Sequence, residues 1–391
     1  MTLDELKKDD QTYVSGAYAR FDLAIREGKN AVCWDYDGKR YVDFGSGIGV
    51  NSLGFADDKW IMAVAEQAKR FAHCSNLYYS EPCIRVAKTL CERTGMKKAF
   101  FQNSGAEANE AMIKAARKYS HDHYGDGRHE IVSLVNSFHG RTVTTLTATG
   151  QEGMHKDFAP FTGGFVYAKA NDAADLGEKV SEKTCAILVE LVQGEGGVVP
   201  LDRVFVDQVA KLCEKEDILL LIDEVQTGVG RTGSLYAFEQ FGLSPDLVST
   251  AKGLGGGLPI GAVLFGEKTK DVFGPGDHGS TFGGNAAVCA GAAAVLERMD
   301  EAFLKDVRRK GERIREKLMG LSNVETVSGL GMMLGVSLKK GTGKEAAVRC
   351  LERGLIVLTA KERIRLLPPL TIGDAELEEG LSILCSVIES F

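Results

Sequence analysis

The feature that most constrains the fold is a regular alternation of short apolar runs and helical patterns between residues 98 and 266. Runs of strand length lie at 98–103, 130–136, 184–191, 218–223, 246–251 and 261–266, with helical patterns between them, as at 105–119 and 203–216. This alternation is typical of a mainly parallel α/β sheet covered by helices on both faces. Ligands of such sheets bind beyond the carboxyl ends of the strands. The sequence therefore predicts a site assembled there from distant segments.

The two ends of the chain predict a second, smaller domain. After residue 285, helical patterns at 286–299, 301–320, 343–353 and 374–390 alternate with short strand patterns near 324–338 and 355–366. A chain of 391 residues is long enough for one large domain and a smaller one. We expect an N-terminal part of the small α+β domain at 1–55, a large domain at 56–286 and a C-terminal part of the small domain at 287–391.

The charge and the cysteine content limit which partners and which cellular compartment we expect. The net charge is −7, and no block of lysines and arginines is present, which disfavours nucleic acid and membrane surfaces as partners. The first ten residues are charged and lack the apolar stretch of a signal peptide. Nine scattered cysteines, with no Cys-x-x-Cys pair, are typical of the reducing cytoplasm. We therefore expect a cytoplasmic protein.

Two charged residues stand at the ends of predicted strands. Asp223 ends the run 218–223, and Lys252 follows the run 246–251 and opens a glycine-rich turn. Pyridoxal 5'-phosphate (PLP) needs both groups, because a lysine forms a Schiff base with its aldehyde and an acid keeps its pyridine nitrogen protonated. Taken singly, Asp223 as a helix cap and Lys252 as a surface charge would be the simpler interpretation. The motifs that follow favour PLP.

The segment 103–110, Asn-Ser-Gly-Ala-Glu-Ala-Asn-Glu, follows a strand and opens a helix. Free backbone N–H groups and the helix dipole at such a point bind phosphate. In isolation, Ser104 with Glu107 three residues on is also an ordinary capping box. Other phosphate motifs fit less well, because 341–345 lacks the upstream glycine and the Ser/Thr of a P-loop, and 45–50 lacks the third glycine of the dinucleotide fingerprint.

A ring-binding motif, Ser-Phe-His-Gly-Arg, follows the strand that ends near residue 136. Phe138 can stack on a planar ring, and Arg141 can hold a carboxylate with two parallel hydrogen bonds. His139 alone is more often a structural histidine than a catalyst. No metal site is predicted, since the remaining clustered histidines lack a cysteine or acid pattern; they are His121, His123 and His129.

Further candidates lie in glycine-rich or apolar surroundings. Glu195 is flanked by glycines and can approach a ligand, although an exposed turn is the simpler interpretation. Ser280 and Thr281 offer hydroxyls before a tight turn, which suits phosphate oxygens. Arg365 alternates with apolar neighbours on a predicted strand. Since an unpaired buried charge is costly, Arg365 is expected to bind a carboxylate.

These motifs occur together in an order that resembles the class III, fold-type I PLP aminotransferases, and most closely the acetylornithine aminotransferases among them. The segments that carry the resemblance are 44–54, 75–79, Asn-Ser-Gly-Ala-Glu-Ala-Asn-Glu, Phe-His-Gly-Arg, Asp-Glu-Val-Gln-Thr-Gly, Ser-Thr-Phe-Gly-Gly-Asn and Arg365. They span nearly the whole chain, so the resemblance implies the PLP-transferase fold type I. It also implies a homodimer with shared active sites.

The resemblance implies a role for each candidate residue. Lys252 and Asp223 would be catalytic. The implied cofactor contacts are Gly105, Ala106, Phe138, Asp223, Glu224, Val225, Gln226, Lys252 and Thr281, the last toward the phosphate of the neighbouring subunit. The implied substrate contacts are Arg141 and Ser280 for the amino donor, and Arg365 for the α-carboxylate of glutamate or 2-oxoglutarate, with Glu195 as the removable partner of Arg365.

The implied reaction is transamination of N2-acetyl-L-ornithine with 2-oxoglutarate, giving N-acetyl-L-glutamate 5-semialdehyde and L-glutamate, a step of arginine biosynthesis. Ornithine, succinylornithine, acetyl-lysine and 4-aminobutyrate are alternative donors. Two alternatives of another class are a non-catalytic PLP-binding protein and a nucleotide-dependent oxidoreductase. The absorbance of bound PLP would separate the oxidoreductase from the other interpretations, and turnover would separate the enzyme from the binder.

Replacing Lys252 tests the cofactor assignment. We expect Lys252→Ala to abolish turnover while the protein still binds PLP through phosphate and ring contacts, because the variant lacks the amine that bonds to the aldehyde. Borohydride reduction of the wild-type holoenzyme, followed by peptide mass spectrometry, should find the label on Lys252. A label on another lysine would show the assignment to be wrong.

Overall fold

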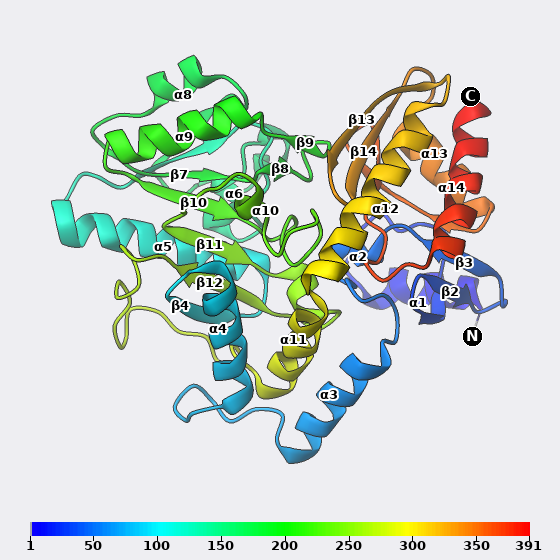
Figure 1. Ribbon diagram of the computed structural model, residues 1–391, viewed down its shortest axis with the longest axis horizontal. Coiled ribbons are helices and arrows are strands. Elements are labelled where there is room, and N and C mark those ends of the chain that lie inside the picture. The colour runs from blue at the N-terminus through cyan, green and yellow to red at the C-terminus, as the bar shows by residue number, and fades with distance from the viewer. Residues whose placement is uncertain (1) are drawn as a thin grey trace.

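The computed structural model describes residues 2–391, and a seven-stranded sheet forms its centre (Figure 1). The strands, in spatial order, are β4 (Lys98–Gln102), β12 (Gly261–Phe265), β11 (Leu247–Thr250), β10 (Leu219–Asp223), β7 (Thr184–Val189), β5 (Glu130–Leu134) and β6 (Phe165–Ala168). β12 runs antiparallel to both of its neighbours, and the pairs from β11 to β6 are parallel. The prediction of a mainly parallel α/β sheet is confirmed.

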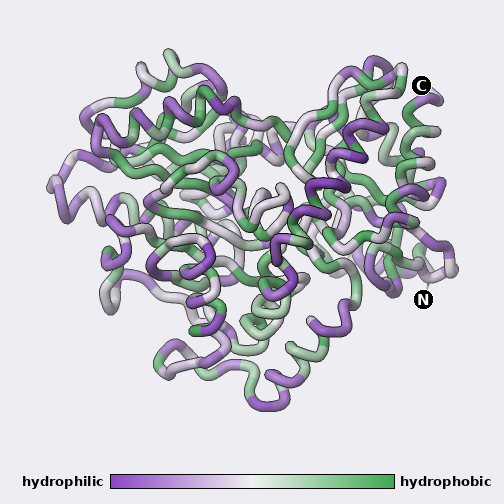
Figure 2. Tube along the Cα trace, in the orientation of Figure 1, coloured by the Kyte–Doolittle hydropathy of each residue, from purple (hydrophilic) through white to green (hydrophobic). Residues whose placement is uncertain are grey.

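Alternating side chains of the central strands face helices on opposite sides of the sheet. Leu188 and Leu221 pack in one apolar cluster with α5 (Gly105–Tyr124), whereas Ile187 and Ile222 pack in another with α9 (Arg203–Lys215). With both faces covered, these strands read as continuous apolar runs. Figure 2 shows mainly hydrophobic residues along the central strands and a mixture of hydrophilic and hydrophobic residues along the helices.

The two ends of the chain meet in a smaller sheet on the side where both termini lie (Figure 1). Its strands, in spatial order, are β1 (Ile25–Lys29), β2 (Val32–Asp35), β3 (Arg40–Asp43) and β15 (Leu355–Ile356). A second four-stranded sheet contains β13 (Val324–Leu330), β14 (Met333–Leu338), β17 (Arg363–Leu366) and β16 (Leu358–Ala360). The predicted domain boundaries near residues 55 and 286 stay a prediction.

Helices and short strands complete the fold. The helices toward the carboxyl terminus are α11 (Ala286–Arg298), α12 (Glu301–Met319), α13 (Gly343–Glu352) and α14 (Asp374–Glu389). The other elements are α1 (Leu3–Tyr13), α2 (Ser46–Gly49), α3 (Asp58–Arg70), α4 (Glu81–Thr94), α6 (Val143–Ala148), α7 (Glu152–His155), α8 (Ala173–Lys179), α10 (Ala237–Gln240), β8 (Val192–Gln193), β9 (Val199–Pro200) and a 3₁₀ turn at Lys252–Gly255. Within residues 2–391, no helix combines the length and the apolar character that crossing a membrane requires.

The short element α2 has a left-handed backbone and supports the turn that carries Lys252. Its residues Ser46 to Gly49 all have positive φ angles, between 47° and 75°. L-residues adopt this conformation at a cost of about 1 kcal/mol or more each, so the surrounding packing must hold it. A few residues later, the Ser52 hydroxyl donates to the Gly253 carbonyl oxygen over 2.8 Å. The N-terminal segment therefore braces the residue next to Lys252.

Gly261 offers a test of how the sheet places the start of α5. A Cβ at Gly261 would lie 2.2 Å from the carbonyl oxygen of Ser104, the N-cap of α5. We expect Gly261→Ala to displace the first turn of α5, lower PLP affinity and reduce the free energy of unfolding by about 1–3 kcal/mol. Urea unfolding and PLP titration of the apoprotein measure both effects. The control is Gly163→Ala, because a Cβ there meets no atom within 4 Å; equal effects of the two substitutions would contradict the prediction.

Candidate active site

A cavity of about 240 Å³ lies at the carboxyl ends of the parallel strands. Its wall comes from the segments that follow β4, β5, β7, β10 and β11, which the predicted sheet brings together. The lining residues are Gly105, Ala106, Asn109, Phe138, His139, Gly140, Arg141, Glu190, Asp223, Val225, Gln226 and Lys252. The cavity therefore gathers seven of the residues predicted from the sequence to bind the cofactor, and Arg141 of those predicted to bind the substrate.

Asp223 is a buried carboxylate at the end of β10, with 3% of its surface exposed. Its Oδ2 accepts hydrogen bonds from Asn109 Nδ2 at 2.7 Å and from His139 Nδ1 at 2.8 Å, and its Oδ1 accepts one from the Val225 N–H at 3.0 Å. These three donors orient both carboxylate oxygens. Asp223 can therefore present an acid of fixed orientation to a group in the cavity.

Lys252 enters the cavity from the turn after β11, and its φ angle of 43° is left-handed. A strained conformation of this kind at a lysine is typical of a functional position. Burial lowers the pKa of the Lys252 amine, and the nearby Glu195 and Asp223 carboxylates oppose that shift. A lowered pKa leaves more of the amine uncharged near neutral pH, which is the form that acts as a nucleophile or a base.

The first turn of α5 forms one wall of the cavity. The Ser104 hydroxyl accepts from the Glu107 N–H at 3.1 Å, so Ser104 is the N-cap, but the full capping box is absent because the Glu107 carboxylate accepts from the Asn103 N–H instead. The same turn also presents Gly105 and Ala106 to the cavity. A Cβ on Gly105 would lie 2.6 Å from Val225 Cγ1, so glycine allows the turn to pack closely there. The start of this 20-residue helix, with its free N–H groups and the positive end of its dipole, suits an anion.

Two apolar side chains flank the cavity. Phe138 and Val225 both line the cavity and are half-buried. The guanidinium carbon of Arg141 lies 5.7 Å from the centroid of the Phe138 ring, within the range of a cation–π contact. Arg141 is exposed, so it can bind an anion that approaches from outside.

A buried ion pair lies beside the cavity. Arg365 is 4% exposed, and its Nη1 pairs with Glu195 Oε1. The same Nη1 lies 3.4 Å from Gln226 Oε1, and Gln226 lines the cavity. Within residues 2–391, no partner reaches Arg365 Nε. The pair of Arg365 and Glu195 that the family resemblance implies is therefore present, and Nε of Arg365 is free within the described residues.

Besides Glu195 and Arg365, three further predicted residues lie outside the cavity lining. The Glu224 carboxylate accepts from the Phe238 N–H at 2.8 Å and from the Thr227 hydroxyl, so it holds the following loop. Ser280 Oγ accepts from Asn103 Nδ2 and from the Gly283 N–H. Thr281 is exposed at the surface of the subunit. Their cofactor and substrate roles stay predictions.

Asn109, Gly140 and Glu190 line the cavity although the sequence did not single them out. Asn109 stands one helical turn after the Gly105–Ala106 pair, and this spacing could have indicated it. Gly140 has a φ of 140°, and a Cβ there would lie 2.8 Å from the Ala106 Cβ, which marks a close approach. Glu190 ends an apolar strand, as Asp223 does, and the same signal could have found it.

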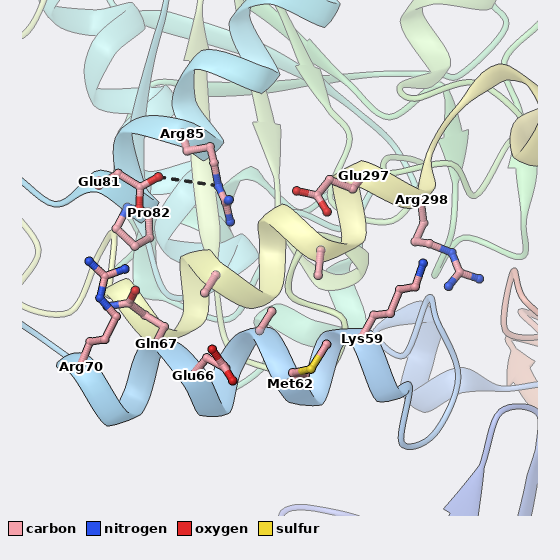
Figure 3. Close-up of a pocket in the computed structure, with 13 residues that line it drawn as sticks. Lys59, Met62, Glu66, Gln67, Arg70, Glu81, Pro82, Arg85, Glu297 and Arg298 are labelled. Carbon is pink, nitrogen blue, oxygen red and sulfur yellow. Dashed lines mark ion pairs between the residues drawn. The ribbon is translucent and has the colours of Figure 1, made fainter.

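A second concavity, of about 690 Å³, lies between α3, α4 and α11 (Figure 3). Figure 3 shows basic and acidic side chains mixed around it, among them Lys59, Arg70, Glu66 and Glu297. It lies on helices rather than at strand ends, and it lacks the buried acid and amine of the smaller cavity. No group of three or more acids, histidines or cysteines in the described chain is placed to hold a metal ion.

Comparison with known proteins identifies the family. The family model "Aminotransferase class-III" matches residues 13–388. The chain belongs to this family. It is 51% identical over 390 residues to the acetylornithine aminotransferase of Haemophilus ducreyi, covering 99% of each chain. It is 43% identical over 372 residues to the succinylornithine transaminase of Photorhabdus laumondii, covering 93% of this chain and 92% of that one.

A solved ornithine aminotransferase from Toxoplasma gondii, described with PLP at partial occupancy in its active site, superposes with a TM-score of 0.95. It is 29% identical in sequence, and the match covers 100% of this chain and 94% of that one. The protein is thus a PLP-dependent aminotransferase, a class of enzyme that moves an amino group between a small-molecule donor and a keto acid. The cavity suits PLP, since an anion site, apolar flanks, an amine and a buried acid surround one space.

Replacement of Asp223 tests the arrangement at the base of the cavity. We expect Asp223→Asn to lower the transamination rate roughly 100-fold or more, because the neutral amide no longer stabilises a positive charge beside it. The fold should remain, since asparagine keeps the size of the side chain. Steady-state kinetics and circular dichroism measure the two effects. A rate close to that of the wild type would remove Asp223 from the reacting site.

Proposed function

We propose that this aminotransferase converts N2-acetyl-L-ornithine and 2-oxoglutarate to N-acetyl-L-glutamate 5-semialdehyde and L-glutamate. The buried pair of Arg365 and Glu195 beside the cavity is the observation that carries the proposal. The full-length identity of 51% to an acetylornithine aminotransferase supports the same substrate. In the cell, the reaction would serve arginine biosynthesis.

The two substrates of this reaction differ at the carbon that reacts. 2-Oxoglutarate carries an α-carboxylate there, whereas acetylornithine carries only a methylene chain. Arg365 suits the carboxylate but would be an unpaired buried charge beside the methylene chain, and breaking a buried pair costs about 3–5 kcal/mol. Glu195 lies in a glycine-flanked turn and is partly exposed, so it can pair with Arg365 for one substrate and move aside for the other.

The chain's own residues would divide the remaining tasks. Bound PLP supplies an electron sink. Lys252 would accept and deliver the proton at the reacting carbon, a role that its lowered pKa favours. Asp223 would keep the pyridine nitrogen protonated, and Gly105 and Ala106 would hold the phosphate. Exposed Arg141 would bind the carboxylate at the far end of acetylornithine.

We further propose a homodimer with shared active sites, in the cytoplasm. Apolar side chains are strongly exposed on one subunit, including Leu77 at 86%, Tyr79 at 98% and Phe282 at 62%, and exposed apolar groups are typical of interfaces. Thr281, next to Phe282, would reach the phosphate in the partner's site. All nine cysteines are free thiols, which supports a reducing compartment.

A panel of amino donors assayed with 2-oxoglutarate tests the substrate. Acetylornithine, succinylornithine, ornithine, acetyl-lysine and 4-aminobutyrate should be compared by kcat/KM, with acetylornithine expected to give the highest value. Succinylornithine is the strongest rival because of the 43% identity to a succinylornithine transaminase. A higher kcat/KM for any rival would reassign the donor while leaving the aminotransferase chemistry in place.

Single-turnover measurements of the two half-reactions test the roles of Arg365 and Glu195. We expect Glu195→Ala to slow the acetylornithine half-reaction more than the glutamate half-reaction, because Arg365 is then left unpaired beside the methylene chain. Arg365→Ala should do the reverse, since it removes the carboxylate partner of glutamate. The absorbance change of the bound cofactor reports each rate. Equal losses in both half-reactions for each variant would rule the switch out.

A further inference from the structure

Glu190 joins two segments that the proposed mechanism uses separately. It ends the apolar run of β7 and is 5% exposed. Its Oε1 accepts a hydrogen bond from the Phe138 N–H at 2.8 Å, and its Oε2 accepts one from the Gly194 N–H at 3.2 Å. One buried carboxylate therefore binds backbone groups from two different loops. Charged acceptors make the stronger class of hydrogen bond, so these contacts hold both loops firmly.

The two loops carry the ring-binding wall and the ion pair. Phe138 lines the cavity, and Gly194 immediately precedes Glu195. A Cβ on Gly194 would lie 2.3 Å from Gln226 Nε2, so the turn packs directly against Gln226. Gln226 in turn lies 3.4 Å from Arg365 Nη1 and 3.5 Å from Glu195 Oε1. Glu190 therefore fixes the start of the turn from which the Glu195 side chain would move.

We propose that Glu190 is a positioning residue that ties the backbone of Phe138 to the turn carrying Glu195, so that the ring-binding wall and the Arg365–Glu195 pair keep a fixed relation. The switch between two substrates then needs only the Glu195 side chain to move, while the turn beneath it stays in place. This inference rests on the proposed function for the identity of the two substrates. The tether itself rests on the two hydrogen bonds.

The ionisation of Glu190 should control the tether. Burial raises the pKa of Glu190 to about 7, while His139 lowers it and Asp223 raises it. The Lys252 amine also interacts electrostatically with this carboxylate. An ionised carboxylate accepts from both amides, whereas a protonated one has an O–H that donates and gives up part of its accepting capacity. The tether is therefore complete above pH about 7 and loosens below it.

The free energy of unfolding should change with pH in the opposite direction to the two hydrogen bonds of Glu190. The folded pKa of Glu190 lies above its ordinary value of 4.5, so the folded state binds more protons than the unfolded state between these two values. The stability that this proton contributes is fully present below pH 4.5 and is lost as the pH rises through about 7. A purely structural role predicts only this loss of stability. A positioning role also predicts that the ratio of the acetylornithine half-reaction rate to the glutamate half-reaction rate rises with pH.

Glu190→Gln and Glu190→Asp, studied as holoenzymes, separate these roles. Glutamine keeps the size of the side chain but cannot ionise, and its amide group opposes one of the two N–H donors. At pH 8 we expect the ratio of acetylornithine to glutamate half-reaction rates to fall about 10-fold or more, and the rise of this ratio through pH about 7 to disappear. Aspartate in Glu190→Asp is shorter but can still ionise. This variant should have slower half-reactions, and the ratio of their rates should still depend on pH.

Hydrogen–deuterium exchange provides a readout that does not need turnover. Peptides containing the Phe138 and Gly194 amides should exchange faster in Glu190→Gln than in the wild type at the same pH. The matched control is Asp246→Asn, because Asp246 Oδ2 also holds a sheet amide, the Leu220 N–H at 2.9 Å, and burial also raises its pKa. Asp246 precedes β11 and does not line the cavity. This control should lose stability and leave the half-reaction ratio unchanged.

The outcomes keep the two proposals apart. If the wild type does not transaminate acetylornithine, the proposed function fails, and the exchange measurement still decides whether Glu190 ties the two loops. If it does, an unchanged ratio and pH profile in Glu190→Gln would overturn the positioning role. Unchanged exchange at Phe138 and Gly194 would overturn the tether, as would an equal change of the ratio in Asp246→Asn.

Discussion

The buried carboxylate of Asp223 is the interaction on which the rest of the site depends. Removing an acid from water is costly unless hydrogen bonds favour its charged form. Here Asn109 comes from α5, His139 from the loop after β5, and the Val225 N–H from the next turn. The groups that donate hydrogen bonds to the acid also belong to the walls of the cavity around it. Charge and shape are therefore set by one network.

Strand ends were the part of the site that the sequence could predict. Asp223 and Lys252 were found because a charge after an apolar run is conspicuous, and parallel strands bring such ends together. The alternation of strands and helices was predictable for the same reason. The edge strand β6 was missed because its apolar run is only four residues long, Phe165–Ala168, and three of the four residues are half-buried. The antiparallel direction of β12 was also hidden, since a buried strand has the same pattern in either direction.

Contacts between distant residues could not be predicted from the pattern alone. Glu190 and Glu224 are both buried acids at strand ends, and burial raises the pKa of each to about 7. Only the folded structure distinguishes their roles, because Glu190 lines the cavity and Glu224 accepts from the Phe238 N–H at the start of α10. A carboxylate partner for Arg365 was expected because a buried arginine needs one, and the family resemblance implied Glu195; the third member, Gln226, depends on the course of two loops.

The pairing of β3 with β15 affects how the chain can fold during synthesis. The first strands of the smaller sheet leave the ribosome long before their final partner, so their edge stays open while most of the chain is made. An open strand edge is prone to pair with other chains. Closing so distant a pairing is also slow, because a long loop must be ordered first. Until residues 355–356 are made, the free edge of β3 is therefore a site where the growing chain can pair with another chain.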